Sequence, residues 1–282
     1  MTTDNSATSI LIIGAAQGIG QAIARTFAAD HYHVILVDLS ESVYDTAQQI
    51  RVDLPQASVD TTVLDATDLR AVEQLAENIT ELLPEAQHNL QHVVYSAGAG
   101  SGKFGFPFWN MHPNDWKRVL DVNLMGAVNV AHAFSKVLRA NLSDDSAKVV
   151  DSTLLFIASI AGQMGSQTDP PYSAAKAGLI NFMQVVAKDL APFGIRANAI
   201  SPGMIQTSLT RSIWQAWNDQ QAEHDKIDYT QWGQDKLKDI CPLARWQTPE
   251  EIAATALFLA STGAANITGQ TINVDGGIIM HS

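Results

Sequence analysis

The chain has 282 residues, of which 46% are hydrophobic and 16% charged, a composition typical of a globular protein. Lys and Arg together number 17 and Asp and Glu 29, which gives a formal net charge of −12. Because such a surface repels phosphate backbones and anionic lipids, we expect no nucleic acid and no membrane among the partners.

Residues 1–8 are polar and have neither the basic nor the apolar region of a signal peptide. We therefore predict a flexible N-terminus and a cytoplasmic location. From residue 9 onward no Pro-, Ser- or Gly-rich linker divides the chain, so residues 9–282 are predicted to form a single domain.

Short apolar segments alternate with longer amphipathic ones along this domain. The predicted strands cover residues 9–13, 33–38, 61–65, 92–97, 154–159, 195–201 and 270–275. The predicted helices cover residues 18–29, 41–51, 68–83, 114–140, 172–191 and 249–261. This alternation is typical of βαβ units, so the predicted fold class is α/β, a Rossmann-like doubly wound parallel sheet of seven strands with helices on both faces. Residues 204–246 interrupt the rhythm with two helical patterns and are predicted to be a helical insertion over one end of the sheet.

A glycine-rich turn, GAAQGIG, follows the first predicted strand. In such a turn Gly14 permits a tight bend, Gly18 lets the backbone approach a pyrophosphate, and Gly20 lets the helix pack close to the strand. The GxxxGxG spacing differs from the more usual GxGxxG, and glycine-rich turns also occur for packing alone. The turn favours a dinucleotide site and leaves the packing interpretation open.

An acidic residue, Asp38, ends the second predicted strand 18 residues after Gly20. A carboxylate at this separation accepts hydrogen bonds from the adenosine ribose and repels a 2′-phosphate. Ala16, Gln17 and Leu39 stand where a basic residue would hold that phosphate. We therefore predict NAD, rather than NADP, as the cofactor.

Three side chains in the second half of the chain have the spacing of a catalytic group. Tyr172 and Lys176 are four residues apart at the start of an apolar helix, and therefore on one face of it. Ser159 ends the fifth predicted strand, 13 residues before Tyr172. A tyrosine that only packs the helix is the alternative, and the coincidence of all three positions argues against it. An adjacent ammonium favours the phenolate, so Lys176 is expected to lower the pKa of Tyr172.

No pattern indicates a metal site. Cys241 is the only cysteine, which excludes an internal disulfide and cysteine-based metal centres, and the eight histidines show no HExxH spacing. We expect no bound metal.

With these motifs the chain resembles the short-chain dehydrogenase/reductase family from Ser9 to about Gly277. The segments that carry the resemblance are GAAQGIG, DAT, SAG, DVNLMG, ASIAG, YSAAK, ISPGMIQT and ITGQTINVDGG. The resemblance implies hydride transfer between NAD and a secondary alcohol or ketone, with Tyr172 as general acid and base. It implies that Lys176 also binds the nicotinamide ribose, that Ser159 holds the substrate oxygen, and that Asn123 holds a water in a proton relay.

The resemblance further implies which residues contact the cofactor and how the chain assembles. The cofactor contacts are Gly14, Gln17, Gly18, Ile19, Gly20, Asp38, Leu39, Asp65, Ala66, Ser96, Ala97, Gly98, Tyr172, Lys176, Pro202, Gly203, Ile205 and Thr207. Because the family is commonly tetrameric, a homotetramer is expected.

The substrate pocket is expected to lie between the loop 98–113 and the insertion, which acts as a lid. The insertion is rich in tryptophan, at Trp214, Trp217, Trp232 and Trp246. Such residues favour a partly apolar alcohol or ketone, or else they pack the lid on its own domain or on a neighbouring subunit. Lys103 and Arg211 would suit a carboxylate, but the acids between 219 and 228 argue against a net basic pocket.

Two alternatives to an NAD-dependent alcohol dehydrogenase are kept. One is an NADP-dependent ketone reductase, which needs a basic phosphate clamp that the sequence does not show. The other is a sensor or scaffold that binds NAD without turnover; loss of the Tyr172 and Lys176 pair would be its mark, and both residues are present.

Overall fold

The computed structural model describes residues 8–83, 89–103, 105–140, 152–166 and 168–280. The alternating segments build a seven-stranded parallel sheet with the order β3-β2-β1-β4-β5-β6-β7. Its strands are β1 (Thr8–Ile13), β2 (His33–Asp38), β3 (Val59–Val63), β4 (Asn89–Tyr95), β5 (Thr153–Ile157), β6 (Arg196–Pro202) and β7 (Thr271–Val274). This is the predicted Rossmann-like doubly wound fold. Of the predicted flexible N-terminus, residue 8 begins β1, and residues 1–7 lie outside the described part of the chain.

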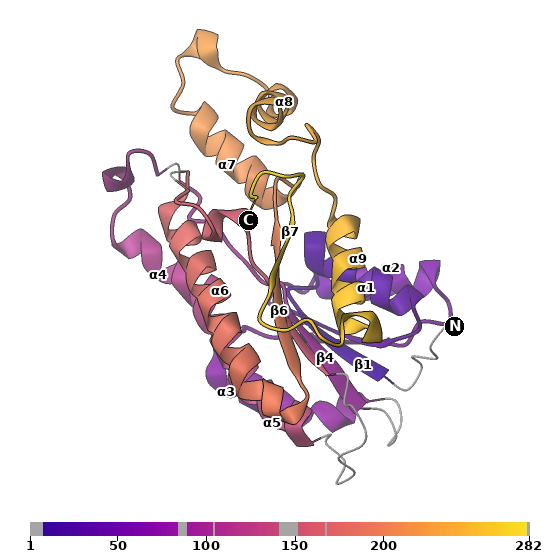
Figure 1. Cartoon of the computed structure of the whole chain (residues 1–282). Helices are drawn as coiled ribbons and strands as arrows, with labels where there is room; N and C mark the ends of the chain where they lie inside the picture. Colours follow the sequence, from indigo (N-terminus) through magenta and orange to yellow (C-terminus); the bar gives the residue numbers. More distant parts are fainter. Residues whose placement is uncertain (1–7, 84–88, 104, 141–151, 167, 281–282) are drawn as a thin grey trace.

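Helices cover both faces of the sheet (Figure 1). One face carries α1 (Gly18–Ala29), α2 (Val43–Asp53) and α9 (Pro249–Ala260), and the other carries α3 (Leu69–Glu77), α5 (Gly126–Ala140) and α6 (Pro170–Leu190). Along β1, Ile10 and Ile12 pack into the first of these cores, whereas Leu11 and Ile13 pack into the second. The near-continuous apolar strands of the sequence are thus buried on both sides.

The helix predicted over residues 114–140 is wrong in one respect. A wider π-helical turn, Asp121–Met125, separates α4 (Asn114–Leu120) from α5. The buried Asn123 side chain within it donates hydrogen bonds to the carbonyl oxygens of Ala99 (2.7 Å) and Val119 (2.8 Å). Amphipathic periodicity is read over a window of several turns, so a single π-helical turn inside it is not resolved.

Three predicted strands end two residues earlier than expected, and the first is β3, which ends at Val63. β4 ends at Tyr95 and β5 at Ile157, so that Ser96 and Ser159 lie in the loops beyond them. Ser159 instead caps a short 3₁₀ turn, its Oγ accepting a hydrogen bond from the Ala161 amide at 3.2 Å. Both serines therefore lie at the carboxyl edge of the sheet, where ligands bind in doubly wound folds.

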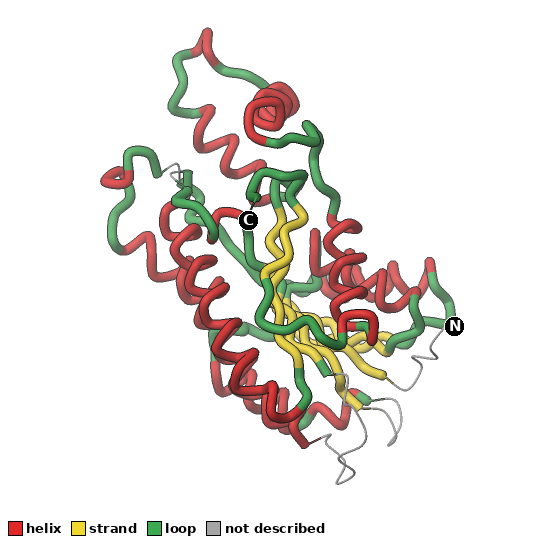
Figure 2. The backbone as a smooth tube through the Cα atoms, in the orientation of Figure 1, coloured by secondary structure: helices red, strands yellow, loops and turns green. Residues whose placement is uncertain are grey.

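The predicted insertion forms two helices beyond the carboxyl ends of the strands, α7 (Ser208–Asn218) and α8 (Tyr229–Ile240) (Figures 1 and 2). It leaves the sheet and returns to it at one place, because Ile205 pairs with Gln247 in an isolated parallel bridge. The Gln247 amide donates to the Met204 carbonyl oxygen at 2.9 Å. The insertion is thus an excursion whose two ends lie side by side.

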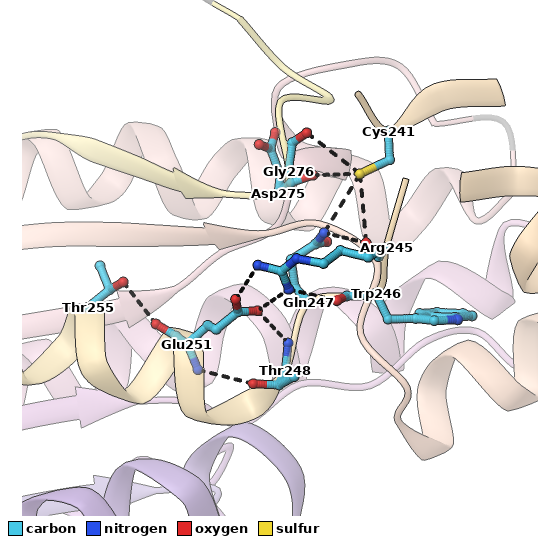
Figure 3. Close-up of polar contacts among 9 residues, drawn as sticks. All are labelled: Cys241, Arg245, Trp246, Gln247, Thr248, Glu251, Thr255, Asp275 and Gly276. Carbon is cyan, nitrogen blue, oxygen red and sulfur yellow. Dashed lines mark hydrogen bonds and ion pairs between the residues drawn. The ribbon is translucent and has the colours of Figure 1, made fainter. Parts of the chain in front are cut away.

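The base of the insertion is tied to the end of β7 and the start of α9 (Figure 3). Cys241 Sγ lies 3.6 Å from the carbonyl oxygens of both Asp275 and Gly276. Arg245 forms an ion pair with Glu251 in the first turn of α9, with 2.6 Å between Nη2 and Oε1. These contacts hold the C-terminal end of the insertion against the segment after β7 and the first turn of α9.

The tryptophans of the insertion pack mainly within it. Trp232 is buried in a small apolar core with Met204, Tyr229, Leu237 and Cys241, and the three other tryptophans cover that core. Among the described residues, Trp232 is the only one of the four tryptophans that lines the large cavity at the carboxyl ends of the strands. This favours the packing interpretation for the others. Separately, no helix in the described ranges is long and apolar enough to cross a membrane.

Candidate active site

A cavity of about 1000 Å³ opens at the carboxyl edge of the sheet, between the strand ends and the insertion. Its wall contains every predicted site residue except Asn123, from Gly14 in the first turn to Thr207 at the start of α7. Segments that are far apart in the sequence therefore contribute to one site. Lys103, which was expected as a possible substrate contact, is not in the wall; it is paired with Asp115 at 2.8 Å.

The glycine turn forms one end of this cavity. Gly14 has a φ of +89°, and a Cβ on it would lie 2.5 Å from the Ala97 amide nitrogen, so the turn and the β4 loop touch through backbone alone. A Cβ on Gly18 would meet nothing within 4 Å. No side chain caps the first turn of α1. Open space in front of free helix N–H groups suits a phosphate group, so this end of the cavity fits a dinucleotide.

Asp38 lies beside the glycine turn at the end of β2. Its Oδ2 accepts a hydrogen bond from the Ala16 amide at 2.9 Å, and its Oδ1 accepts one from the Ser40 amide at 3.0 Å. Each carboxylate oxygen keeps a lone pair for a ligand hydroxyl. The cations in the described wall belong to α4, α6, α7 and α8 and not to the loops around Asp38.

Ser159, Tyr172 and Lys176 meet in the middle of the cavity. A hydrogen bond joins the side chains of Ser159 and Tyr172. Lys176, one helical turn after Tyr172, is 3% exposed and donates from Nζ to the Ile157 carbonyl oxygen at 2.8 Å. Its Nζ lies 5.6 Å from the centre of the Tyr172 ring. The three predicted side chains thus come together as their spacing indicates.

Burial shifts the pKa values of both Tyr172 and Lys176 in the protein alone. Burial raises the pKa of Tyr172 to about 12, the hydrogen bond from Ser159 opposes that shift, and the charge of Asp169 adds to it. Burial also lowers the pKa of Lys176 to about 7. For both side chains, desolvation disfavours the charged form. Lys176 is not among the groups that shift the pKa of Tyr172, so the expectation that Lys176 lowers this pKa stays a prediction.

Asn123 lies behind the cavity wall, next to Lys176. Its side chain is fully buried, and Oδ1 has no hydrogen-bond partner among the described residues. A Cβ on Gly98 would lie 3.1 Å from this oxygen and 3.6 Å from Lys176 Nζ. The amide oxygen of Asn123 and Nζ of Lys176 thus both border the space that a side chain at position 98 would fill.

Asp169 is a residue of this site that the sequence analysis missed. It precedes α6 and lines the cavity, 4% exposed, with Oδ2 accepting from the Ser101 amide at 2.8 Å. Its Oδ1 has no partner in the described part of the chain, and burial raises the pKa of the carboxyl group. The available signal was an acidic residue at a helix N-cap position three residues before Tyr172.

Metal ligands are not grouped in the described residues: no three His, Cys, Asp or Glu side chains lie where they would hold an ion. The expectation of a metal-free protein stays a prediction.

Comparisons with known proteins agree on the kind of protein to which this cavity belongs. A family model described as Enoyl-(Acyl carrier protein) reductase matches residues 14–279. A 3-oxoacyl-[acyl-carrier-protein] reductase of Synechocystis is 33% identical over 274 residues, which cover 96% of both chains. An NAD-dependent glycerol dehydrogenase of Listeria innocua is 30% identical over 267 residues, 95% of this chain and 92% of that one. The crystal structure of a sorbitol-6-phosphate 2-dehydrogenase of Erwinia amylovora superposes with a TM-score of 0.83 at 29% identity, covering 97% of this chain and all of that one.

Proposed function

The chain belongs to the short-chain dehydrogenase/reductase family of oxidoreductases, and from that premise we propose that it interconverts a secondary alcohol and a ketone with NAD. One observation carries the proposal: the Tyr172 hydroxyl, bonded to Ser159 and next to Lys176, shares a cavity with the glycine turn and Asp38. The chemistry that NAD supplies when bound is hydride transfer, and its positive nicotinamide favours a phenolate nearby.

Each side chain of the group has a proposed task. Tyr172 removes the hydroxyl proton during oxidation and returns it to the carbonyl oxygen during reduction. Ser159 holds the substrate oxygen by a hydrogen bond, which stabilises charge developing there. Lys176 in its ammonium form stabilises the phenolate, and a phenolate nearby in turn favours that form of Lys176. Lys176 also binds the nicotinamide ribose. Asn123 Oδ1 holds a water that links Lys176 to solvent.

The cofactor is proposed to lie along the strand ends. The glycine turn and the start of α1 hold the pyrophosphate, Asp38 the adenosine ribose, Asp65 and Ala66 the adenine, and the segment 96–98 the adenosine side. Pro202, Ile205 and Thr207 contact the nicotinamide end. Residues 9–282 form one domain in this proposal, and the segment of about 204–246 acts as its lid.

The experiment that tests the proposal is the change in NADH absorbance with a panel of secondary alcohols and ketones. Turnover with NAD supports it, and turnover with NADP alone would instead favour the ketone-reductase alternative. Tight NADH binding without turnover of any compound would favour a sensor. Light scattering tests the homotetramer, and the cytoplasmic location and the absence of nucleic-acid partners stay predictions.

Asp38→Asn is expected to lower the preference for NAD over NADP, measured as the ratio of their kcat/KM values, by about 10-fold or more. The substitution keeps one of the two side-chain oxygens that accept from the backbone amides of the turn, and it removes the charge that repels a 2′-phosphate. Asp45→Asn, at an exposed position in α2, is the matched control and should keep the ratio. An unchanged ratio in Asp38→Asn would mean that another residue selects the cofactor.

The value of kcat/KM for alcohol oxidation should rise with pH between pH 6 and 10. The phenolate is the base, and because the pKa of Tyr172 is raised to about 12 in the protein alone, the base form grows as pH increases. Asp169→Asn removes a negative charge that raises this pKa, so the rise should move to lower pH. Asp189→Asn, at an exposed position on the same helix, should not move it. A flat profile, or a shift to higher pH in Asp169→Asn, would contradict the assignment.

A further inference from the structure

Two cations of the insertion line the same cavity as Tyr172, Arg211 of α7 and Lys236 of α8. We propose that they bind an oxyanion of the substrate, so that the alcohol or ketone carries a carboxylate or a phosphate ester. The inference rests on the proposed function, because it concerns the substrate of that same site.

An aromatic stack holds the two cations in place. The Arg211 guanidinium carbon lies 4.5 Å from the centre of the Tyr229 ring, and Lys236 Nζ lies 5.0 Å from the centre of the Trp232 ring. The two rings stack on each other at 5.9 Å with an interplanar angle of 22°. Both rings are buried, and the Tyr229 hydroxyl is hydrogen-bonded to Thr210 at 2.9 Å. The two cations, exposed Arg211 and half-buried Lys236, therefore lie on adjacent rings of one buried aromatic pair.

Neither cation is neutralised by the described part of the chain. Arg211 and Lys236 make no ion pair and no side-chain hydrogen bond there. Lys236 is half-buried, and desolvation lowers its pKa. A partly desolvated ammonium without a partner is unfavourable, and a bound anion offsets that cost. The Arg211 guanidinium lies over the Tyr229 ring and has no polar partner among the described residues, so its N–H groups stay available for a bidentate oxyanion.

The four acidic residues between 219 and 228, which made a basic pocket unexpected from the sequence, have other partners. Glu223 pairs with Lys226 at 2.8 Å, and Asp228 caps α8 by accepting from the Gln231 amide at 2.9 Å. Asp219 accepts from the Gln215 side chain at 2.6 Å, and Asp225 lies 3.5 Å from His224. None of these four acids, all of which are described, contributes to the cavity wall. The local charge inside the lid is thus positive although the chain as a whole is acidic.

The test compares matched substrate pairs in the full-length enzyme with NAD. The carboxylate arm uses 3-hydroxybutanoate and its methyl ester, and the phosphate arm uses sorbitol 6-phosphate and sorbitol. The charged member should have the higher kcat/KM in at least one arm. Arg211→Gln and Lys236→Gln should each lower the charged-to-neutral ratio by about 10-fold or more, as expected for a lost charge-assisted hydrogen bond. Lys238→Gln, at an exposed position on the same helix, is the control and should keep the ratio.

Ratios that both substitutions leave unchanged would overturn the inference. So would a loss of NADH affinity in the two variants that matches the loss with the charged substrate, because the cations would then bind the phosphates of the cofactor.

A direct titration separates failure of the inference from failure of the proposed function. If no pair is turned over, the proposed function loses its support while this binding site is still tested. Inorganic phosphate or 3-hydroxybutanoate should change the tryptophan fluorescence, since Lys236 lies over Trp232. The change should be lost in the Arg211→Gln/Lys236→Gln double variant, and an equal response in that variant would overturn the inference.

Discussion

Tyr172→Phe should lower kcat for both oxidation and reduction by at least ~10²-fold while NADH still binds. The substitution removes one oxygen from a half-buried ring and keeps the rest of its packing. The lost oxygen is the one that bonds to Ser159, and in the proposed reaction it carries the proton. Stopped-flow measurement of NADH formation, with NADH binding followed by fluorescence, separates the two effects.

Tyr44→Phe is the control for this substitution, because Tyr44 is exposed on α2 and far in the sequence from the proposed catalytic residues. It should keep kcat and NADH affinity. Turnover of Tyr172→Phe near the level of the unsubstituted protein would remove Tyr172 from the mechanism. Equal loss of turnover and NADH binding would instead assign Tyr172 a binding role.

Gly14→Ala should destabilise the folded protein by about 3 kcal/mol and weaken NADH binding. The left-handed backbone at φ +89° costs a non-glycine residue about 1–2 kcal/mol, and the contact of the new Cβ with the Ala97 backbone adds about 1–3 kcal/mol. Since backbone atoms of β1 and β4 cannot move apart without breaking the sheet, the strain should reach the glycine turn. Urea unfolding measures the change.

Gly102→Ala is a matched control, because Gly102 has a similar φ of +74° and a Cβ there would meet nothing within 4 Å. It should show only the conformational cost, about 1–2 kcal/mol. Equal destabilisation by the two substitutions would show that the close approach to Ala97 has no energetic effect.

The fold was predictable because its signals are local and repeated. The five inner strands, which include most of residues 9–13 and 33–38, are buried on both faces, and every strand except β7 is followed by a helix. The residues of the cavity follow from the same rule, since the ends of parallel strands meet at one edge. Ser159 and Tyr172 come together because β5 ends and α6 begins at that edge.

The features that sequence reasoning missed depend on contacts between distant segments. The π-helical turn around Asn123 covers only five residues between α4 and α5, which is shorter than the window over which periodicity is read. The shifted pKa values of Tyr172 and Lys176 follow from burial, which spacing does not measure. Lys236 was overlooked because its role depends on Trp232 and on where the neighbouring acids find partners.

The bridge between Ile205 and Gln247 has a consequence for how such a protein changes over time. The segment 204–246 leaves the sheet and returns to it at adjacent points. Exchanging it for a segment of twice the length therefore raises the entropic free-energy cost of closing the loop by only about 0.6 kcal/mol. Such an exchange leaves the register of the strands and the glycine turn unchanged. New substrate selectivity can therefore evolve by replacement of this segment, while the residues outside it that are proposed to bind the cofactor stay unchanged.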